Sequence, residues 1–141
     1  MSTMSVLVSD SSGQELLDPS WEVARDTEDT SLQDGKNFTL EAIPFLKTGE
    51  DCINGEKLEV RAADLGTPHG KKLARTLFDN RDKIDPSWRA FCLVFTGTVG
   101  KDKAGDRRVL SLSWNGKDWY VGFRWLDRKW GGRARLMRIV N

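Results

Sequence analysis

Several short segments of the chain alternate apolar and polar residues, and a period of two predicts β-strands with one buried face. Segments 38–43 and 58–63 follow this alternation, although a short helix over 58–63 fits the same residues. Segment 88–98 is apolar on both faces, which is typical of a central strand covered on both sides. Segment 133–140 predicts a last strand, and the polar, acidic segment 26–36 predicts a solvated loop.

One segment carries the signals of an α-helix rather than of a strand. Thr67 suits the N-cap and Pro68 suits the first helical position, where no backbone N–H is required. Leu73 and Leu77 then fall on one side of a helix that runs over 68–80. We expect this helix to pack on the sheet as scaffold.

Asn115 and Gly116 predict a tight hairpin, because a type I′ turn needs two positive φ angles that Asn and Gly tolerate. A two-residue loop would place Trp114 opposite Lys117 and would divide the two strands into an apolar and a polar face. The apolar face would hold Leu110, Leu112, Trp119, Val121, Phe123 and Trp125, and the polar face Ser111, Ser113, Asp118, Tyr120 and Arg124.

These elements predict a β-rich α+β fold: a curved or partly closed antiparallel sheet of about six strands with one main α-helix packed on it. The last three or four strands are expected to be consecutive and antiparallel. A chain of 141 residues is long enough for one core, so we expect a single globular domain over residues 1–141. Hydrophobic residues make up 38% of the chain, and 13 glycines bring the apolar share into the range of globular proteins.

The sequence does not predict a membrane-spanning helix. The strongest apolar stretch, Ala90 to Gly100, has eleven residues, whereas a spanning helix needs about 20. Residues 1–10 lack the basic start and the apolar stretch of a secretory signal. We therefore expect a cytoplasmic protein with no membrane partner.

The residues that most catalytic and metal sites need are scarce. The chain has one histidine, His69, and two cysteines, Cys52 and Cys92, which are 40 residues apart without a Cys-x-x-Cys pair. This argues against a zinc site. Segment 97–101 has two glycines and a lysine but lacks the first glycine and the Ser/Thr of a phosphate-binding loop. We expect no metal and no cofactor, assign no catalytic residue, and expect a binding protein rather than an enzyme.

The net charge of +1 hides an asymmetry between the two halves of the chain. Residues 1–80 carry a net charge of −7, and residues 81–141 carry +8. Such an asymmetry indicates either a polyanionic ligand for the basic half or a pairing of the two halves, within the chain or between copies.

Segment 124–138 has six basic residues against the single carboxylate of Asp127, with tryptophans between them. Arginine forks suit phosphate oxygens, and flat aromatic rings stack on unpaired bases. Tyr120 and Trp130 are the expected surface aromatics, because Trp125 falls on the apolar face of the hairpin. The candidate polyanion-binding residues are Lys101, Lys103, Arg107, Arg108, Arg124, Arg128, Lys129, Arg133, Arg135 and Arg138.

Three functional hypotheses follow. The first is a small non-enzymatic protein that binds nucleic acid or another polyanion through this basic, tryptophan-containing sheet. The second is a protein-interaction or homo-oligomerising module whose acidic and basic halves pair with a partner or with another copy. The third is a carbohydrate-binding module, because six tryptophans offer flat apolar faces.

Overall fold

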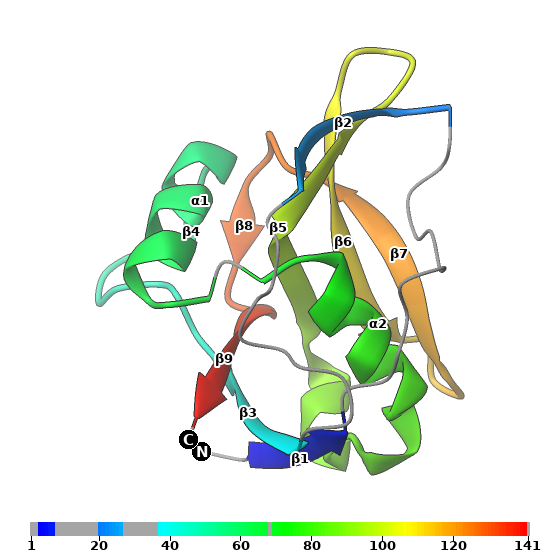
Figure 1. Ribbon diagram of the computed structural model, residues 1–141. Helices are drawn as coiled ribbons and strands as arrows, with labels where there is room; N and C mark the ends of the chain where they lie inside the picture. The colour runs from blue at the N-terminus through cyan, green and yellow to red at the C-terminus, as the bar shows by residue number, and fades with distance from the viewer. Residues whose placement is uncertain (1–2, 8–19, 27–36, 68, 141) are drawn as a thin grey trace.

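The computed structural model describes residues 3–7, 20–26, 37–67 and 69–140 (Figure 1). The predicted acidic loop lies outside these ranges except at Asp26, which ends a strand. Pro68, the predicted first residue of the helix, lies outside them too.

The main element of the fold is a seven-stranded sheet in which six strands follow the order β1-β3-β9-β5-β6-β7 and β2 pairs with β5. Every pair is antiparallel except β5 and β9. The sheet is not closed, because its order ends at β1 and at β7; its curvature stays a prediction. The strands are β1 (Thr3–Leu7), β2 (Glu22–Asp26), β3 (Asn37–Ile43), β5 (Cys92–Lys101), β6 (Arg107–Trp114), β7 (Trp119–Trp125) and β9 (Ala134–Val140), and a separate small sheet pairs β4 (Cys52–Ile53) with β8 (Trp130–Gly131).

The fold is mixed α+β, and the described residues form two α-helices where the sequence predicts one. The helices are α1 (Gly55–Asp64) and α2 (Lys71–Asp79), followed by two 3₁₀ helices, η1 (Arg81–Lys83) and η2 (Pro86–Ala90). No helix in the described ranges is long and apolar enough to cross a membrane.

Two hydrophobic clusters lie on opposite faces of the sheet. α2 contributes Leu73 and Leu77 to the first cluster, which includes Leu93 of β5. α1 contributes Leu58 to the second cluster, which includes Val94, the next residue of β5. Successive residues of a strand point to opposite faces, so each helix covers a different side of the sheet.

Segment 58–63 belongs to α1, so the strand predicted there is wrong and the alternative, a short helix, is correct. Asn54 begins the helix, because its Oδ1 accepts a 2.8 Å hydrogen bond from the backbone N–H of Lys57. Leu58 and Ala62, four residues apart, are both buried, as residues on one side of a helix should be.

α2 starts later than the sequence predicts. Gly70 is its N-cap residue, and the Thr67 hydroxyl instead donates a 3.0 Å hydrogen bond to the carbonyl oxygen of Ala62. A Cβ at Gly70 would lie 2.3 Å from Thr98 Oγ1 and 2.9 Å from the backbone of β5. The predicted first turn of the helix is wrong. The helix begins at Gly70 because only a glycine allows this close approach to β5, and such a tertiary contact has no local sequence signal.

β5 starts at Cys92, so the strand predicted over 88–98 is wrong at its beginning. Asp85 starts η2 instead, and its carboxylate accepts a 2.9 Å hydrogen bond from the backbone N–H of Ser87. Beyond Cys92 the strand is buried on both faces, as a central strand should be.

The β6–β7 hairpin forms where Asn115 and Gly116 predict it, but its loop has four residues, 115–118, instead of two. Trp114 therefore faces Trp119. Gly116 is the only loop residue with a positive φ, and the Asn115 side chain accepts hydrogen bonds from two backbone N–H groups of the loop, so no type I′ turn forms. The register moves by an even number of residues, which preserves the two predicted faces.

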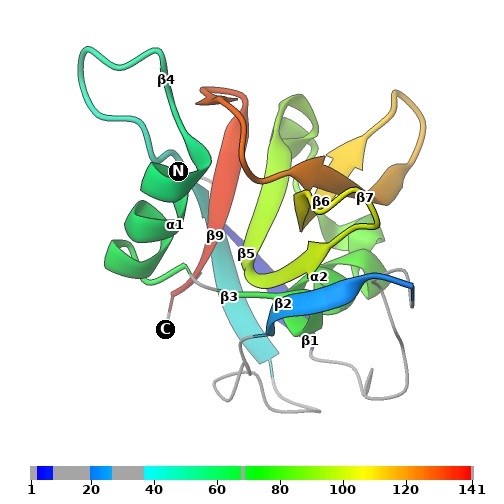
Figure 2. The same ribbon diagram turned by 90° about the horizontal axis from the view of Figure 1, so that it is seen from above.

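β9 does not follow β7 in the sheet, contrary to the predicted run of antiparallel strands. It lies between β3 and β5 and is parallel to β5, so only β5, β6 and β7 form the predicted consecutive set. Residues 126–133, which we call the crossing segment, pass from the edge of the sheet to its centre (Figure 2). Leu126 and Trp130 belong to the cluster of α1, so the crossing takes place on the face opposite α2.

α1 is tied to the loop before it by an ion pair. The Arg61 guanidinium donates a 2.7 Å hydrogen bond to the Glu50 carboxylate and a 2.9 Å hydrogen bond to the carbonyl oxygen of Phe45. The hydrogen bond from Arg61 lowers the pKa of Glu50 to about 2.

We expect Glu50→Gln to destabilise the protein at neutral pH and to lose this effect in acid. The pKa of Glu50 in the folded state lies below the ordinary value of 4.5, so the carboxylate contributes stability above pH 4.5. This contribution decreases as the pH falls toward about 2. Urea unfolding of both proteins at a series of pH values checks this, and a difference in stability that stays constant with pH would contradict it.

Candidate functional site

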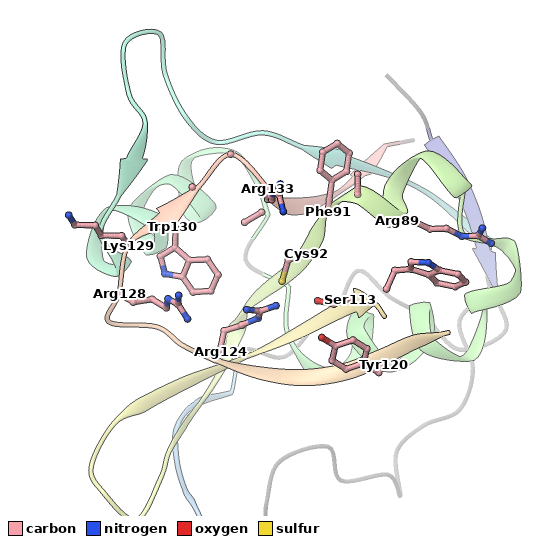
Figure 3. A pocket seen from close by; sticks show the side chains of 15 residues that line it. Arg89, Phe91, Cys92, Ser113, Tyr120, Arg124, Arg128, Lys129, Trp130 and Arg133 are labelled. Atoms are coloured by element: carbon pink, nitrogen blue, oxygen red, sulfur yellow. The ribbon is translucent and has the colours of Figure 1, made fainter. Parts of the chain in front are cut away.

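A cleft of about 660 Å³ opens on the face of the sheet that α2 does not cover (Figure 3). Its floor is the hairpin face that carries Ser113, Tyr120 and Arg124. Residues 89–92 and the crossing segment form its walls. Five of the 15 residues that line the cleft are arginine or lysine, and none of the 15 is acidic.

A buried leucine and a buried tryptophan fix the crossing segment. The backbone N–H of Leu126 donates a 2.9 Å hydrogen bond to the carbonyl oxygen of Arg107. The carbonyl oxygen of Leu126 accepts hydrogen bonds of 2.9 Å from Trp130 Nε1 and 2.9 Å from the backbone N–H of Arg128. Trp130 is 5% exposed, whereas Arg128 and Lys129 are exposed. The anchors therefore hold the basic side chains at the surface.

Arg107 ties the crossing segment to α1. Its guanidinium donates a 2.9 Å hydrogen bond to Asp127 and a 3.1 Å hydrogen bond to Glu59. The hydrogen bond with Asp127 raises the pKa of Arg107 and lowers the pKa of Asp127. Both groups are therefore charged at neutral pH, and the wall of the cleft stays attached to the helix.

Three arginines line the cleft from different segments of the chain. Arg124 belongs to β7, Arg128 to the crossing segment, and Arg133 to the end of that segment (Figure 3). Within the part of the chain that the structure describes, neither these arginines nor Lys129 form an ion pair with a carboxylate. Like charges gathered in this way repel each other, so the cleft favours a bound anion.

Ser113 adds a neutral donor to the floor. It is 7% exposed, and its Oγ has no hydrogen-bond partner among the described residues. Figure 3 shows this hydroxyl near the thiol of Cys92 and facing the cleft. A buried hydroxyl that makes no hydrogen bond destabilises the folded protein. A ligand with an acceptor oxygen would supply the missing hydrogen bond.

A smaller hollow of about 370 Å³ adjoins the cleft and shares Tyr120, Arg124 and Arg128 with it. Trp125 lines this hollow and is 48% exposed. The Arg108 guanidinium lies 4.5 Å from the centre of the Trp125 ring. The basic cleft is therefore continuous with an exposed aromatic side chain.

The structure separates the ten basic residues that the sequence predicts. Lys101 and Lys103 are exposed near the β5–β6 turn and line neither hollow. The residues that line the cleft or the smaller hollow are Arg108, Arg124, Arg128, Lys129 and Arg133.

The other three arginines have partners within the protein, as does Arg108, which forms an ion pair with Asp102. Arg107 is paired as described above, and Arg138 forms an ion pair with Glu41 of β3. The guanidinium of Arg135 lies 3.9 Å from the centre of the Phe91 ring and donates a 3.0 Å hydrogen bond to the carbonyl oxygen of Ala134. Burial lowers the pKa of Arg135. These side chains stabilise the fold.

The structure reverses the expected positions of two tryptophans. Trp130, expected at the surface, is buried, because its indole N–H is satisfied by the carbonyl oxygen of Leu126. Trp125, expected in the core, is exposed, because it is the last residue of β7 and lies beyond the cluster under the hairpin. Tyr120 is 42% exposed, as expected.

Several residues of the cleft were not candidates from the sequence, chiefly Arg89, Cys92 and Ser113. The polar face predicted for the hairpin was a signal for Ser113, since it groups this serine with Tyr120 and Arg124. Arg89 gave no local signal, because its place depends on η2; its guanidinium lies 4.0 Å from the centre of the Trp114 ring.

Within the described ranges, no group of three or more His, Cys, Asp or Glu side chains is placed to hold a metal ion. Comparisons of the chain with protein-family models, with curated proteins and with solved structures found no match. The function is therefore argued from the geometry and chemistry of the cleft.

We expect Gly55→Ala to loosen the wall of the cleft and to destabilise the protein by about 2 kcal/mol. A Cβ at Gly55 would lie 2.0 Å from the carbonyl oxygen of Leu126. Gly132→Ala is the control, because the nearest atom to its Cβ would be Leu46 Cδ1 at 3.9 Å. Denaturant unfolding measures both variants, and equal stabilities would show that α1 and the crossing segment are not in tight contact.

We expect pyrophosphate to raise the melting temperature by roughly 2–4 °C, because a multivalent anion in the cleft reduces the repulsion among its arginines. The comparison is sodium chloride at the same ionic strength. The rise should be lost in Arg128→Gln/Arg133→Gln and kept in Lys101→Gln/Lys103→Gln, which removes the same charge outside the cleft. Equal rises in the two double variants would contradict binding in the cleft.

Proposed function

We propose that the protein binds nucleic acid and that the cleft contacts its phosphate groups. The observation that supports this most directly is that Arg124, Arg128 and Arg133 line one cleft, with Lys129 at its rim, and that no acidic residue is among the described residues that line it. A chain of phosphates matches several separate cations better than a single small anion does.

Arginine suits this role because its planar guanidinium donates two parallel hydrogen bonds to phosphate oxygens. The Ser113 hydroxyl supplies one more donor at the floor of the cleft. Phosphate contacts release counterions, so the logarithm of the affinity falls with the logarithm of the salt concentration. Four contacts to a single strand predict a slope of about −3.

Ion pairs within the chain account for part of the charge asymmetry between its halves. Glu41 pairs with Arg138, and Glu59 pairs with Arg107. Each of these pairs joins the acidic half of the sequence to the basic half. The basic residues of the cleft take no part in such pairs among the described residues, which leaves their charge available to an external anion.

We expect labelled oligonucleotides to bind in a salt-dependent manner, measured by fluorescence anisotropy at low and physiological salt. Arg128→Glu/Arg133→Glu should weaken binding at least tenfold and reduce the salt slope by about 1.5, because two phosphate contacts are lost. Lys101→Glu/Lys103→Glu is the matched control, since it changes the net charge equally but lies outside the cleft.

Equal losses in the two double variants would assign the binding to overall charge instead of to the cleft. No binding at low salt would contradict the proposal. A mass that rises with concentration in light scattering would then favour a self-associating module.

A further inference from the structure

We infer that the smaller hollow beside the cleft binds an unpaired nucleobase, which makes the ligand single-stranded nucleic acid. This inference rests on the proposed function, because phosphate contacts in the cleft hold the strand next to the hollow. It depends on three observations: a glycine in the floor, two exposed aromatic rings, and two arginines common to both hollows.

Gly122 lines the hollow and has no side chain to cover the backbone of β7 there. It lies on the same face of β7 as Tyr120 and Arg124 and opposite Ser111 of β6. A Cβ at this position would lie 3.3 Å from Ser111 Oγ and 3.5 Å from Tyr120 Cε2, so a larger residue would fill the space beside the tyrosine ring. Glycine weakens the interior of a strand and often marks a site where another group approaches the backbone closely.

Tyr120 and Trp125 both line the hollow, from opposite faces of the edge strand β7, and both expose more than a third of their surface. Stacking of a base on such a ring strengthens binding by about tenfold or more. Arg108 holds the Trp125 ring, and Asp102 in turn accepts a 2.9 Å hydrogen bond from Arg108 Nε. The ring is therefore held in place before a base arrives, and stacking costs little conformational entropy.

Arg124 and Arg128 line both the cleft and the smaller hollow. A ligand in the hollow therefore reaches these two cations from one side while the rest of it lies in the cleft. A nucleotide has this form, since a planar base is joined through a sugar to a phosphate. With the base beside Gly122, the phosphate lies near Arg124 and Arg128.

The exposed aromatic residues of the smaller hollow would let the protein discriminate single-stranded nucleic acid from other polyanions. In a duplex each base is stacked and paired, so aromatic side chains reach only unpaired bases. A sulfated polysaccharide would contact the arginines of the cleft but has no planar group for Tyr120 and Trp125. The smaller hollow thus favours unpaired nucleic acid over both.

The test compares three labelled probes by anisotropy: a short oligothymidylate, an abasic strand with the same phosphodiester backbone, and the matching duplex. The wild-type protein should bind oligothymidylate about tenfold more tightly than either of the other probes. Trp125→Ala and Gly122→Val should each weaken binding of oligothymidylate at least fivefold and leave binding of the abasic strand unchanged. Trp125→Phe, which keeps a ring, should retain most of the affinity.

Tryptophan fluorescence of the wild-type protein gives a second measurement that needs no variant. Oligothymidylate should quench the emission, and the abasic strand should not. Circular dichroism and thermal unfolding check that each variant folds.

Equal affinity for the three probes, with equal quenching, would overturn the base site. If Arg128→Glu/Arg133→Glu still weakened all three, the proposed phosphate contacts would stand without it. No binding of any probe to the wild-type protein at low salt would overturn both proposals.

Discussion

The return of the last strand to the middle of the sheet is the constraint on which the rest of the structure depends. β7 is an edge strand and β9 lies between β3 and β5, so the chain has to cross one face of the sheet. The backbone N–H and C=O groups of the crossing segment need hydrogen-bond partners, although this segment does not lie in a long strand. Leu126 and Trp130 provide this: the leucine carbonyl accepts the indole N–H, and both side chains are buried. The wall of the cleft follows from this topology.

The two faces of the sheet differ in how completely they are covered. α2 packs on an apolar surface, whereas α1 and the crossing segment leave the hairpin face with Ser113, Tyr120 and Arg124 beside the cleft. A hairpin with one apolar and one polar face can gather cations on the polar face without disturbing the cluster beneath it. The carboxylates that pair with Arg107 and Arg138 lie on other elements, α1, β3 and the crossing segment, and do not line the cleft.

The sequence pattern predicted the faces of elements better than their partners. The hairpin register was wrong by two residues, yet its polar face was correct because the shift is even. The position of β9 has no local signal, since its partners are far away in the sequence. For the same reason the basic residues could not be sorted in advance: Arg138 meets Glu41 only because β9 lies beside β3. Alternation also fails at the end of a strand, which is where Trp125 lies.

The parallel pairing of β5 with β9 also joins two parts of the sheet that would otherwise be separate. β3 and β5 are not neighbours in the sheet, and β9 joins them. When two segments that are distant in sequence pair, the chain loses conformational entropy before the new contacts compensate for this loss. Such pairings therefore form slowly. Without β9, the sheet would consist of two separate parts, β1 with β3, and β5 with β2, β6 and β7. A ligand that contacts both the floor and the wall of the cleft binds only the completed sheet, and its binding free energy stabilises the insertion of β9.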